Sequence, residues 1–336
     1  KLTLKGIYFT YNGQAQNNRG KRNRYVFNYG NNPNYTPAST DRWGNFKPRA
    51  HNPADEGGVT GLKNSIYPYA LQGYASFNNA NAAAWMLNKV LLPSGGQIEV
   101  EYEADDYAFV QERRATVMMP ITHTGREAAN TGNRLYDVNS FGSVDDNDKI
   151  YVTVAQPCVN KQDVYDKYLT GLRQLAFKLA VKMPKGKEYL TMYANIQDYG
   201  VGQNANEIWI KLRKVDGYGP LSLTAIEYLR EHLPGQAFAG YEPQGNSLQQ
   251  FGDMLSGMVD GMKGAFKNPV NFLREQKKAQ EIVLQESFVR LNEPVGKKNG
   301  GGHRVKSVVI KDNWNAMTGQ YTSRYGQQYD YTTTEM

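Results

Sequence analysis

The sequence contains a single cysteine, Cys158, among its 336 residues, so no disulfide can form within the chain and no cysteine-based metal site exists. It also lacks any run approaching the ~18 apolar residues that a membrane-spanning helix requires. This absence and the 21% content of charged residues exclude a helical membrane protein. They leave open a membrane barrel, whose strands alternate between polar and apolar residues and give only a weak hydropathy signal.

Residue patterns that carry catalysis are missing as well. The triple glycine at 300–302 lacks the lysine of a phosphate-binding loop, and no GxSxG pattern occurs. The few histidines show neither the HxxxH nor the HExxH spacing of a zinc site, because they are far apart. We therefore expect no catalytic residue, no metal ligand and no cofactor, and we do not expect an enzyme. The four histidines are His51, His123, His232 and His303.

Tyrosine and glycine are abundant, with 24 and 33 residues, and both suit β-rich proteins with long polar loops. The net charge is +7, but the only basic cluster is Arg19, Lys21, Arg22 and Arg24. An exposed hairpin tip explains this cluster, whereas a nucleic-acid site would need a larger basic surface. Acidic lipid headgroups remain a possible partner of the cluster.

The most informative segment follows the turn Pro93-Ser94-Gly95-Gly96, whose two glycines allow positive φ angles. Apolar and acidic residues then alternate, so that opposite faces of one strand carry different chemistry. The alternation slips at Asp105 and Asp106, which predicts a bulge or a strand end there. The apolar face comprises Ile98, Val100, Tyr102 and Ala104, and the acidic face Glu99, Glu101 and Glu103.

Two clusters of acidic residues each allow a functional and a structural interpretation. Alternate glutamates on one strand face lie about 6.5 to 7 Å apart, near the separation of an inverting glycosidase. They cannot flank a bond from opposite sides, however, so a solvated face or a water-filled lumen is favoured. The run Asp145-Asp146-Asn147-Asp148 lacks the later glycine and glutamate of an EF-hand, and a solvated turn is favoured over calcium binding.

Periodicity and composition predict a mainly β chain with an α/β insert. Strand-like stretches at 151–154, 175–183, 189–196 and 208–212, with a helix opening at Pro220, define the insert. The chain starts at Lys1 without a signal peptide, and we expect it to be a mature region or a piece of a longer protein. The predicted segments are a long β-hairpin at 1–30, an irregular loop region at 31–81, a strand pair with a polar loop at 82–149, the α/β insert at 150–245, a Gly/Met-rich amphipathic helix (248–266) with its linker at 246–275, and a β-hairpin at 276–336.

Four stretches of the sequence are relevant here: Asp41–Pro48, Ala82–Ala115, Ile208–Pro220 and Gly300–Trp314. Together they resemble the type IX secretion outer-membrane translocon family, called SprA or Sov. The second and fourth are the most specific, because Gly, Trp and acidic residues match in order and spacing over long runs. Members of this family are many times longer, so the resemblance implies an internal segment.

The resemblance implies a segment of a very large transmembrane β-barrel, with loop and cap elements, that exports folded proteins across the outer membrane of Bacteroidetes-type bacteria. It implies a role in gliding motility or virulence-factor export at the cell surface. The implied partners are the exported proteins, a lateral-gate outer-membrane barrel and a periplasmic plug; no nucleic acid is implied. The glutamates of the acidic face would then point to the lumen, and the insert would be extracellular or periplasmic. The alternative is a secreted β-rich module that binds glycans or proteins, which the many tyrosines and asparagines also suit.

Overall fold

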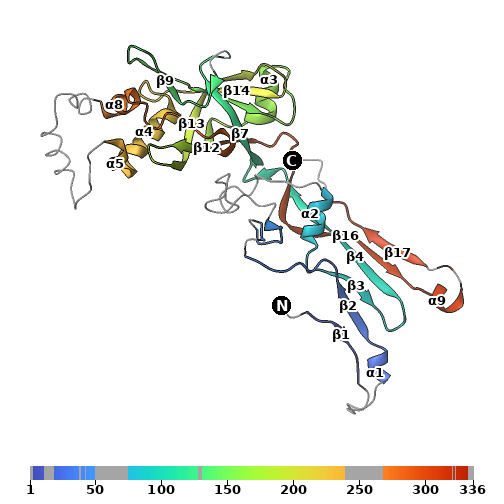
Figure 1. The fold of residues 1–336 in the computed structure, drawn as a ribbon. Coiled ribbons are helices and arrows are strands. Elements are labelled where there is room, and N and C mark those ends of the chain that lie inside the picture. The colour runs from blue at the N-terminus through green and yellow to red at the C-terminus, as the bar shows by residue number, and fades with distance from the viewer. Residues whose placement is uncertain are drawn as a thin grey trace. The chain divides into compact units, whose positions relative to one another are not determined.

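The protein is described by a computed structural model in which residues 3–10, 19–37, 39–41, 43–49, 75–127, 131–238, 268–319, 321 and 323–331 are placed. The chain is mainly β and includes a closed six-stranded barrel and some helices. It divides into two compact units. The described residues of the first unit lie within 3–49, 75–108 and 297–331, and the second unit comprises those within 109–296 (Figure 1).

The second unit is the closed barrel. Its strands follow the ring order β11-β14-β13-β12-β15-β7, and a pairing between β7 and β11 closes the ring. Every neighbouring pair is antiparallel. The six strands are β7 (Thr116–Gly125), β11 (Lys149–Thr153), β12 (Gln174–Lys182), β13 (Lys187–Val201), β14 (Glu207–Leu212) and β15 (Phe288–Asn292).

Helices and short strands complete this unit. The helices are α3 (Lys161–Val164), the π-helix η2 (Tyr165–Leu169), α4 (Pro220–His232), α5 (Pro234–Ala237), α8 (Pro269–Glu275) and the 3-10 helix η4 (Leu284–Glu286). Two short strand pairs and a strand that extends β7 add to the barrel: β5 (Phe109–Val110) with β6 (Arg113–Arg114), β9 (Tyr136–Val138) with β10 (Val144–Asp146), and β8 (Thr131–Gly132) with β7.

The barrel has a large hydrophobic core, and one of its strands is buried on both faces. Seven consecutive residues of β12 are buried, from Leu175 to Val181. Helix α4 begins at Pro220, as predicted, where proline at the first helical position leaves no N–H without a partner. The helix buries one apolar side, formed by Leu221, Ala225, Ile226 and Leu229.

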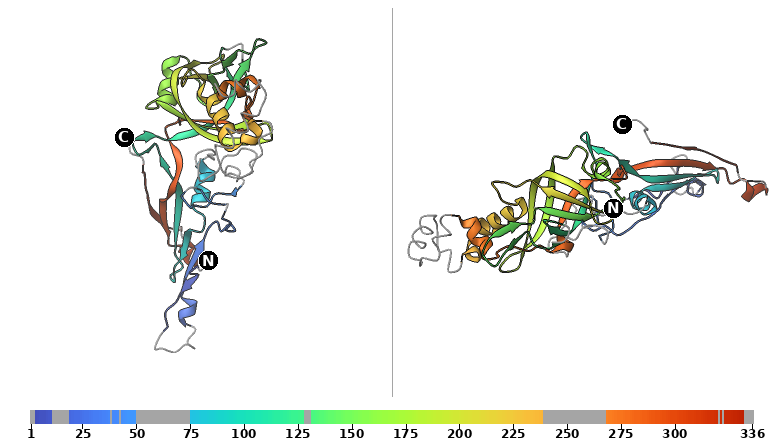
Figure 2. Two further views of the ribbon diagram at one scale, coloured as in Figure 1. Left: turned by 90° about the vertical axis from the view of Figure 1, so that its left-hand side faces the viewer. Right: turned by 90° about the horizontal axis from the view of Figure 1, so that it is seen from above.

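The first unit is a six-stranded antiparallel sheet in the order β1-β2-β3-β4-β16-β17. Its two longest strands, β4 and β16, pair side by side (Figure 1, Figure 2). The strands are β1 (Gly6–Ile7), β2 (Tyr25–Tyr29), β3 (Leu87–Leu91), β4 (Gln97–Tyr107), β16 (Lys298–Lys311) and β17 (Arg324–Gln328), and the helices are α1 (Arg19–Arg22), α2 (Ala75–Ala82) and α9 (Asn315–Thr318).

The sheet of the first unit has almost no core. Among its described residues only Ala84 and Ala104 are buried and hydrophobic, whereas the second unit contains the hydrophobic core cluster of the described residues. Large apolar side chains of the sheet, such as Ile98 and Val100, are only half-buried. Burial of apolar surface is the main stabilising contribution in a folded protein, so the sheet holds an apolar face that the described chain does not cover.

The barrel is inserted between two neighbouring strands of this sheet. Tyr107 at the end of β4 pairs with Lys298 at the start of β16, so both connections leave from the same end of the sheet. None of the helices in the described part of the chain is long and apolar enough to cross a membrane.

The predicted strand after the 93–96 turn is confirmed as β4. Gly95 adopts a φ of +87°, as the turn requires, whereas Gly96 does not need a positive φ. The predicted irregularity at Asp105 and Asp106 is also found, but the extra residues lie on the partner strand. Asn299 pairs with Asp106 and His303 with Ala104, so Gly300–Gly302 form a bulge opposite Asp105.

Two predicted segments differ from the structure because strands pair across long stretches of chain. A hairpin is present within 276–336, because β16 pairs with β17, but β15 pairs with β7 and β12 and is not part of it. The α/β unit extends beyond the predicted 150–245, because ring closure requires β7 and β15. Within the predicted strand pair at 82–149, β3 and β4 do pair, but β7 belongs to the barrel.

The other segments agree in part. Gly6 pairs with Val26, which confirms pairing within the hairpin at 1–30. The described part of the predicted loop region at 31–81 contains no strand, but its end forms helix α2 (Ala75–Ala82), which was not predicted. The strands predicted inside the insert are present as β11, β12, β13 and β14. The Gly/Met-rich helix predicted at 248–266 lies outside the described residues.

The difference in burial between the two units predicts different mutational costs. Phe177→Ala removes a fully buried ring of the barrel and should lower the free energy of unfolding by about 3–5 kcal/mol. Val100→Ala in the half-buried sheet should cost less than about 1 kcal/mol in the isolated chain. Urea denaturation followed by circular dichroism measures both. Equal losses would contradict the assignment of an uncovered apolar face.

Candidate functional site

The acidic face of β4 is neutralised by cations on the neighbouring strands. The Lys311 Nζ atom lies 2.5 Å from a Glu99 carboxylate oxygen, and the Lys89 Nζ atom lies 3.2 Å from the other oxygen. The Lys306 Nζ atom lies 2.9 Å from Glu101. Cross-strand pairs of opposite charge stabilise a sheet, so these ion pairs give the acidic face a structural role. We call this face the carboxylate row; its members are Glu99, Glu101 and Glu103.

Arg304 of β16 is the centre of this network. Its Nε atom donates to Glu103 at 2.7 Å, and its two other nitrogens donate to Asp105 at 3.1 Å and Asp106 at 3.4 Å. The guanidinium also lies over the Tyr331 ring, 4.8 Å from its centroid. One arginine therefore binds three carboxylates at the point where the strand register changes.

The electrostatics of Glu99 do not suit a catalytic general acid. The hydrogen bond from Lys311 lowers the pKa of Glu99, with Lys89 contributing in the same direction. A glycosidase general acid needs the opposite, a carboxyl group whose pKa is raised so that it holds a proton near neutral pH. The geometry thus supports the structural interpretation of these glutamates.

The opposite face of the same sheet is apolar. Paired residues point to the same side, so Ile98 and Val100 of β4 share a face with Ile310 and Val308 of β16. The face continues into β3 and β2 through Val90 and Phe27, and into β17 through Tyr325. None of these side chains is buried. We call this surface the apolar row; its members are Phe27, Val90, Ile98, Val100, Val308, Ile310 and Tyr325.

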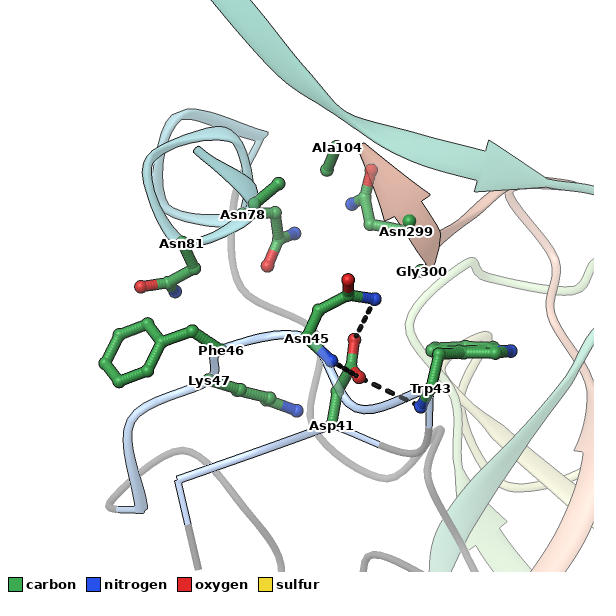
Figure 3. Close-up of a pocket in the computed structure, with 12 residues that line it drawn as sticks. Asp41, Trp43, Asn45, Phe46, Lys47, Asn78, Asn81, Ala104, Asn299 and Gly300 are labelled. Carbon is green, nitrogen blue, oxygen red and sulfur yellow. Dashed lines mark hydrogen bonds between the residues drawn. The ribbon is translucent and has the colours of Figure 1, made fainter. Parts of the chain in front are cut away.

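A small polar cavity lies where α2 and the 41–48 loop meet the bulge (Figure 3). Asp41 shapes the loop, because its Oδ1 atom accepts hydrogen bonds from the backbone N–H groups of Trp43 and Asn45 at 2.9 and 2.8 Å. The Asn45 side chain donates to the Asp41 Oδ2 atom at 3.3 Å. On the other side, the Asn79 Oδ1 atom of α2 accepts from the Ala104 N–H at 2.9 Å, which ties the helix to β4.

Aromatic packing fixes this loop on the sheet. The Trp43 ring packs edge-on against Tyr107, with centroids 5.7 Å apart, and a Cβ atom at Gly300 would lie 2.1 Å from the Trp43 ring. Phe46 packs against Trp85 at 5.3 Å, and the Trp85 Nε1–H donates to the Pro33 carbonyl at 2.9 Å. The cavity therefore depends on glycine at position 300.

The cavity is suited to water and too small for a metabolite. Its volume is about 50 Å³, whereas ligand pockets are usually ~300–1,000 Å³. The Nδ2 atom of Asn81 is buried there without a hydrogen-bond acceptor in the described chain. Burial lowers the pKa of Lys47, against the opposing influence of the Asp41 carboxylate. These features describe a structural junction that one or two water molecules would complete.

Stretches that carry the family resemblance meet at this junction. Trp43 and Asn45 come from the first stretch, Ala104 from the second, and Gly300 from the fourth. The resemblance marks all three stretches, but no local pattern in the sequence shows that they pack together. The Asn79 and Asn81 side chains of α2 were missed, since no pattern in that helix distinguishes a junction from an exposed asparagine-rich segment.

The acidic run at 145–148 is part of a buried ion pair. The Asp146 carboxylate binds the Arg274 guanidinium of α8, and its Oδ1 atom accepts from the Ser222 hydroxyl at 2.7 Å. Asp146, Asn147 and Asp148 are all buried, and Asn147 donates to the Asp137 carboxylate at 3.0 Å. The prediction of a solvated turn is therefore wrong: α8 brings a cation to this turn, and its contribution could not be read from the local sequence.

The three described histidines each pack against a different tyrosine. His123 stacks on Tyr151 with centroids 4.2 Å apart, His232 stacks on Tyr228 at 4.4 Å, and His303 packs edge-on against Tyr102 at 5.8 Å. His51 lies outside the described residues. In the part of the chain that the structure describes, no three His, Cys, Asp or Glu side chains are grouped to hold a metal ion.

The other predicted features are single residues or short segments. Cys158 is buried. The basic cluster falls in and beside helix α1, where the Lys21 Nζ atom lies 6.0 Å from the centroid of the Tyr8 ring.

The chain matches no protein-family model, no curated protein and no solved structure.

The packing of Trp43 over the bulge predicts a position-specific effect of alanine. Gly300 and Gly302 have nearly the same φ, +148° and +151°, so Gly302→Ala, where a Cβ meets nothing within 4 Å, measures the backbone cost alone. Gly300→Ala should destabilise the protein by at least about 1 kcal/mol more, because the ring must move. Thermal unfolding of both variants tests this, and equal destabilisation would contradict a role for the Trp43 contact.

The lowered pKa of Glu99 predicts acid sensitivity of the sheet. A carboxylate whose folded pKa lies below its unfolded value stabilises the fold above the unfolded pKa, and this contribution is lost as the pH falls through the folded pKa. The stability difference between wild type and Glu99→Gln should therefore shrink as the pH falls below about 4.3. Urea midpoints from pH 7 to pH 3 measure it. Glu112→Gln is the control, because exposed Glu112 makes no ion pair with the described residues; an equal pH dependence there would contradict the assignment.

Proposed function

We propose that the sheet of the first unit is part of the wall of a protein-conducting β-barrel channel in an outer membrane. The observation that carries this proposal is the uncovered apolar row on one face of a sheet whose other face bears a neutralised carboxylate row. A channel wall needs this combination, with lipid on one side and water on the other. The carboxylate row would face the lumen and the apolar row the lipid.

Strand length and order support the proposal. A membrane-spanning β-strand needs about 9–11 residues, and β4 and β16 have 11 and 14. All neighbours in the sheet are antiparallel, as in outer-membrane barrels. The barrel at 109–296 would then be a domain carried on one side of the membrane, since it is inserted between two adjacent wall strands at one end of the sheet.

The family resemblance extends the proposal to type IX secretion. In that setting the channel would export folded proteins, with a lateral-gate barrel and a periplasmic plug as partners. The protein would reside in the outer membrane of a Gram-negative bacterium, with the barrel domain extracellular or periplasmic.

A secreted binding module is the second candidate function. It is favoured by the closed barrel of the second unit, which has its own large hydrophobic core and a ring complete within residues 109–296. Such a domain could bind a glycan or a protein whether or not the first unit lies in a membrane.

Single cysteine substitutions at neighbouring positions of β4 distinguish the two candidate functions. Cys158 is fully buried, so labelling of an introduced cysteine has little background. Val100→Cys lies on the apolar row and Glu101→Cys on the opposite face. In phospholipid vesicles, a bimane label at position 100 should be quenched by brominated lipid at least twofold more than a label at position 101.

A third label at Lys185 provides the aqueous control, because Lys185 is exposed in the turn between β12 and β13. The labels at 101 and 185 should both react with a membrane-impermeant maleimide. Equal quenching at 100 and 101, or a chain that stays in solution without binding vesicles, would contradict the channel wall and favour the secreted module.

A further inference from the structure

We propose that one end of the barrel binds an extended acidic peptide in a groove between helix η2 and strand β13. The groove has a volume of about 400 Å³ and lies within residues 165–213. This volume falls in the range of small-ligand sites and far exceeds that of the cavity beside Trp43. The inference does not depend on the membrane proposal, because every lining residue belongs to the second unit.

The groove combines an apolar floor with an aromatic wall. Leu169, Leu172 and Ile196 form the floor. Tyr165 and Tyr199 stand beside one another as offset stacked rings, with centroids 6.3 Å apart and an interplanar angle of 25°. Tyr165 is 37% exposed, so a ligand can reach the ring. Aromatic rings with a polar tip are frequent at binding surfaces, because they provide contact area at low cost in conformational entropy.

Two irregularities of the backbone meet at this groove. Tyr165 and Leu169 belong to a π-helix, a rare element that occurs frequently at functional sites. Across the groove, the register between β13 and β14 shifts from Ile196 to Asp198, so Gln197 is a bulge residue. Bulges are common next to binding sites because they re-aim side chains. Regular backbone hydrogen bonding is therefore interrupted on both sides of the same groove.

The rim of the groove carries positive charge that no described acidic side chain neutralises. Arg173 and Arg213 are exposed, and neither makes an ion pair or a side-chain hydrogen bond with the described residues. The nearest acidic residue along β13, Asp198, is bound by the Lys161 Nζ atom at 2.5 Å, and this hydrogen bond lowers the pKa of Asp198. A guanidinium binds carboxylates through two parallel hydrogen bonds, so an acidic ligand is the complement of this rim.

A peptide fits these features better than a sugar. Side chains of an extended peptide alternate, so a carboxylate can reach the rim while its apolar neighbour enters the floor. Asn195 and Gln197 at the rim can bond the backbone amides of such a peptide. The floor of Leu and Ile offers a sugar no partners for its hydroxyl groups, which would lose their hydrogen bonds to water there.

The test uses fluorescence polarisation to measure how tightly the full chain binds an acetylated, amidated pentapeptide of alternating aspartate and leucine. Arg173→Ala and Arg213→Ala should each weaken binding roughly tenfold, since each removes a charge-assisted hydrogen bond. Lys185→Ala, at the other end of the β12–β13 ladder, removes a similar charge and should leave affinity within twofold. A peptide with asparagine in place of aspartate should bind at least tenfold more weakly.

Several outcomes would overturn the proposal. They are equal affinity for the aspartate and asparagine peptides, unchanged affinity in both arginine variants, and no binding at millimolar peptide while circular dichroism shows a folded protein. A preference for a phosphorylated sugar over the aspartate peptide would also overturn it. The membrane proposal has a separate readout in the labels on β4, so failure of one proposal is distinguishable from failure of the other.

Discussion

The antiparallel ladder between β4 and β16 joins residues about 200 positions apart in the chain, and the arrangement of the first unit depends on it. It places the carboxylate row beside Lys306, Lys311 and Arg304, so charges that would repel along one strand become cross-strand ion pairs. It also fixes the point at which the chain leaves the sheet to form the barrel. Loop closure over so long a segment is costly in entropy, and the inserted barrel reduces that cost by folding compactly.

The glycine bulge in β16 converts this ladder into a site for tertiary packing. Gly300–Gly302 adopt positive φ angles that other residues rarely tolerate, and the space left at Gly300 admits the Trp43 ring. The loop that carries Trp43 is in turn shaped by Asp41, and α2 is bonded to β4 through Asn79. The polar cavity is the common boundary of these elements, and its small volume agrees with a structural role.

The two units differ in how they bury their apolar side chains. The barrel closes its sheet on itself and buries residues on both faces of β12, so it needs no partner to complete its core. The first unit leaves the apolar row half-exposed on an open sheet. A lipid contact for that row and a peptide in the arginine-rimmed groove are separate proposals, because they concern different units and different chemistry.

Local patterns in the sequence were sufficient to predict several features. These are β4 with its two chemically distinct faces, the strands β11–β14, the start of α4 at Pro220 and the irregularity at Asp105. Periodicity and proline or glycine chemistry act within a few residues, so such features can be read directly. Tertiary structure alone decided which strands pair, that β15 and β16 belong to different units, that Arg274 neutralises Asp146, and that Tyr165 meets Tyr199 beside two arginines. These contacts join residues distant in the chain, and no local pattern specifies which partner a strand edge or a charge will find.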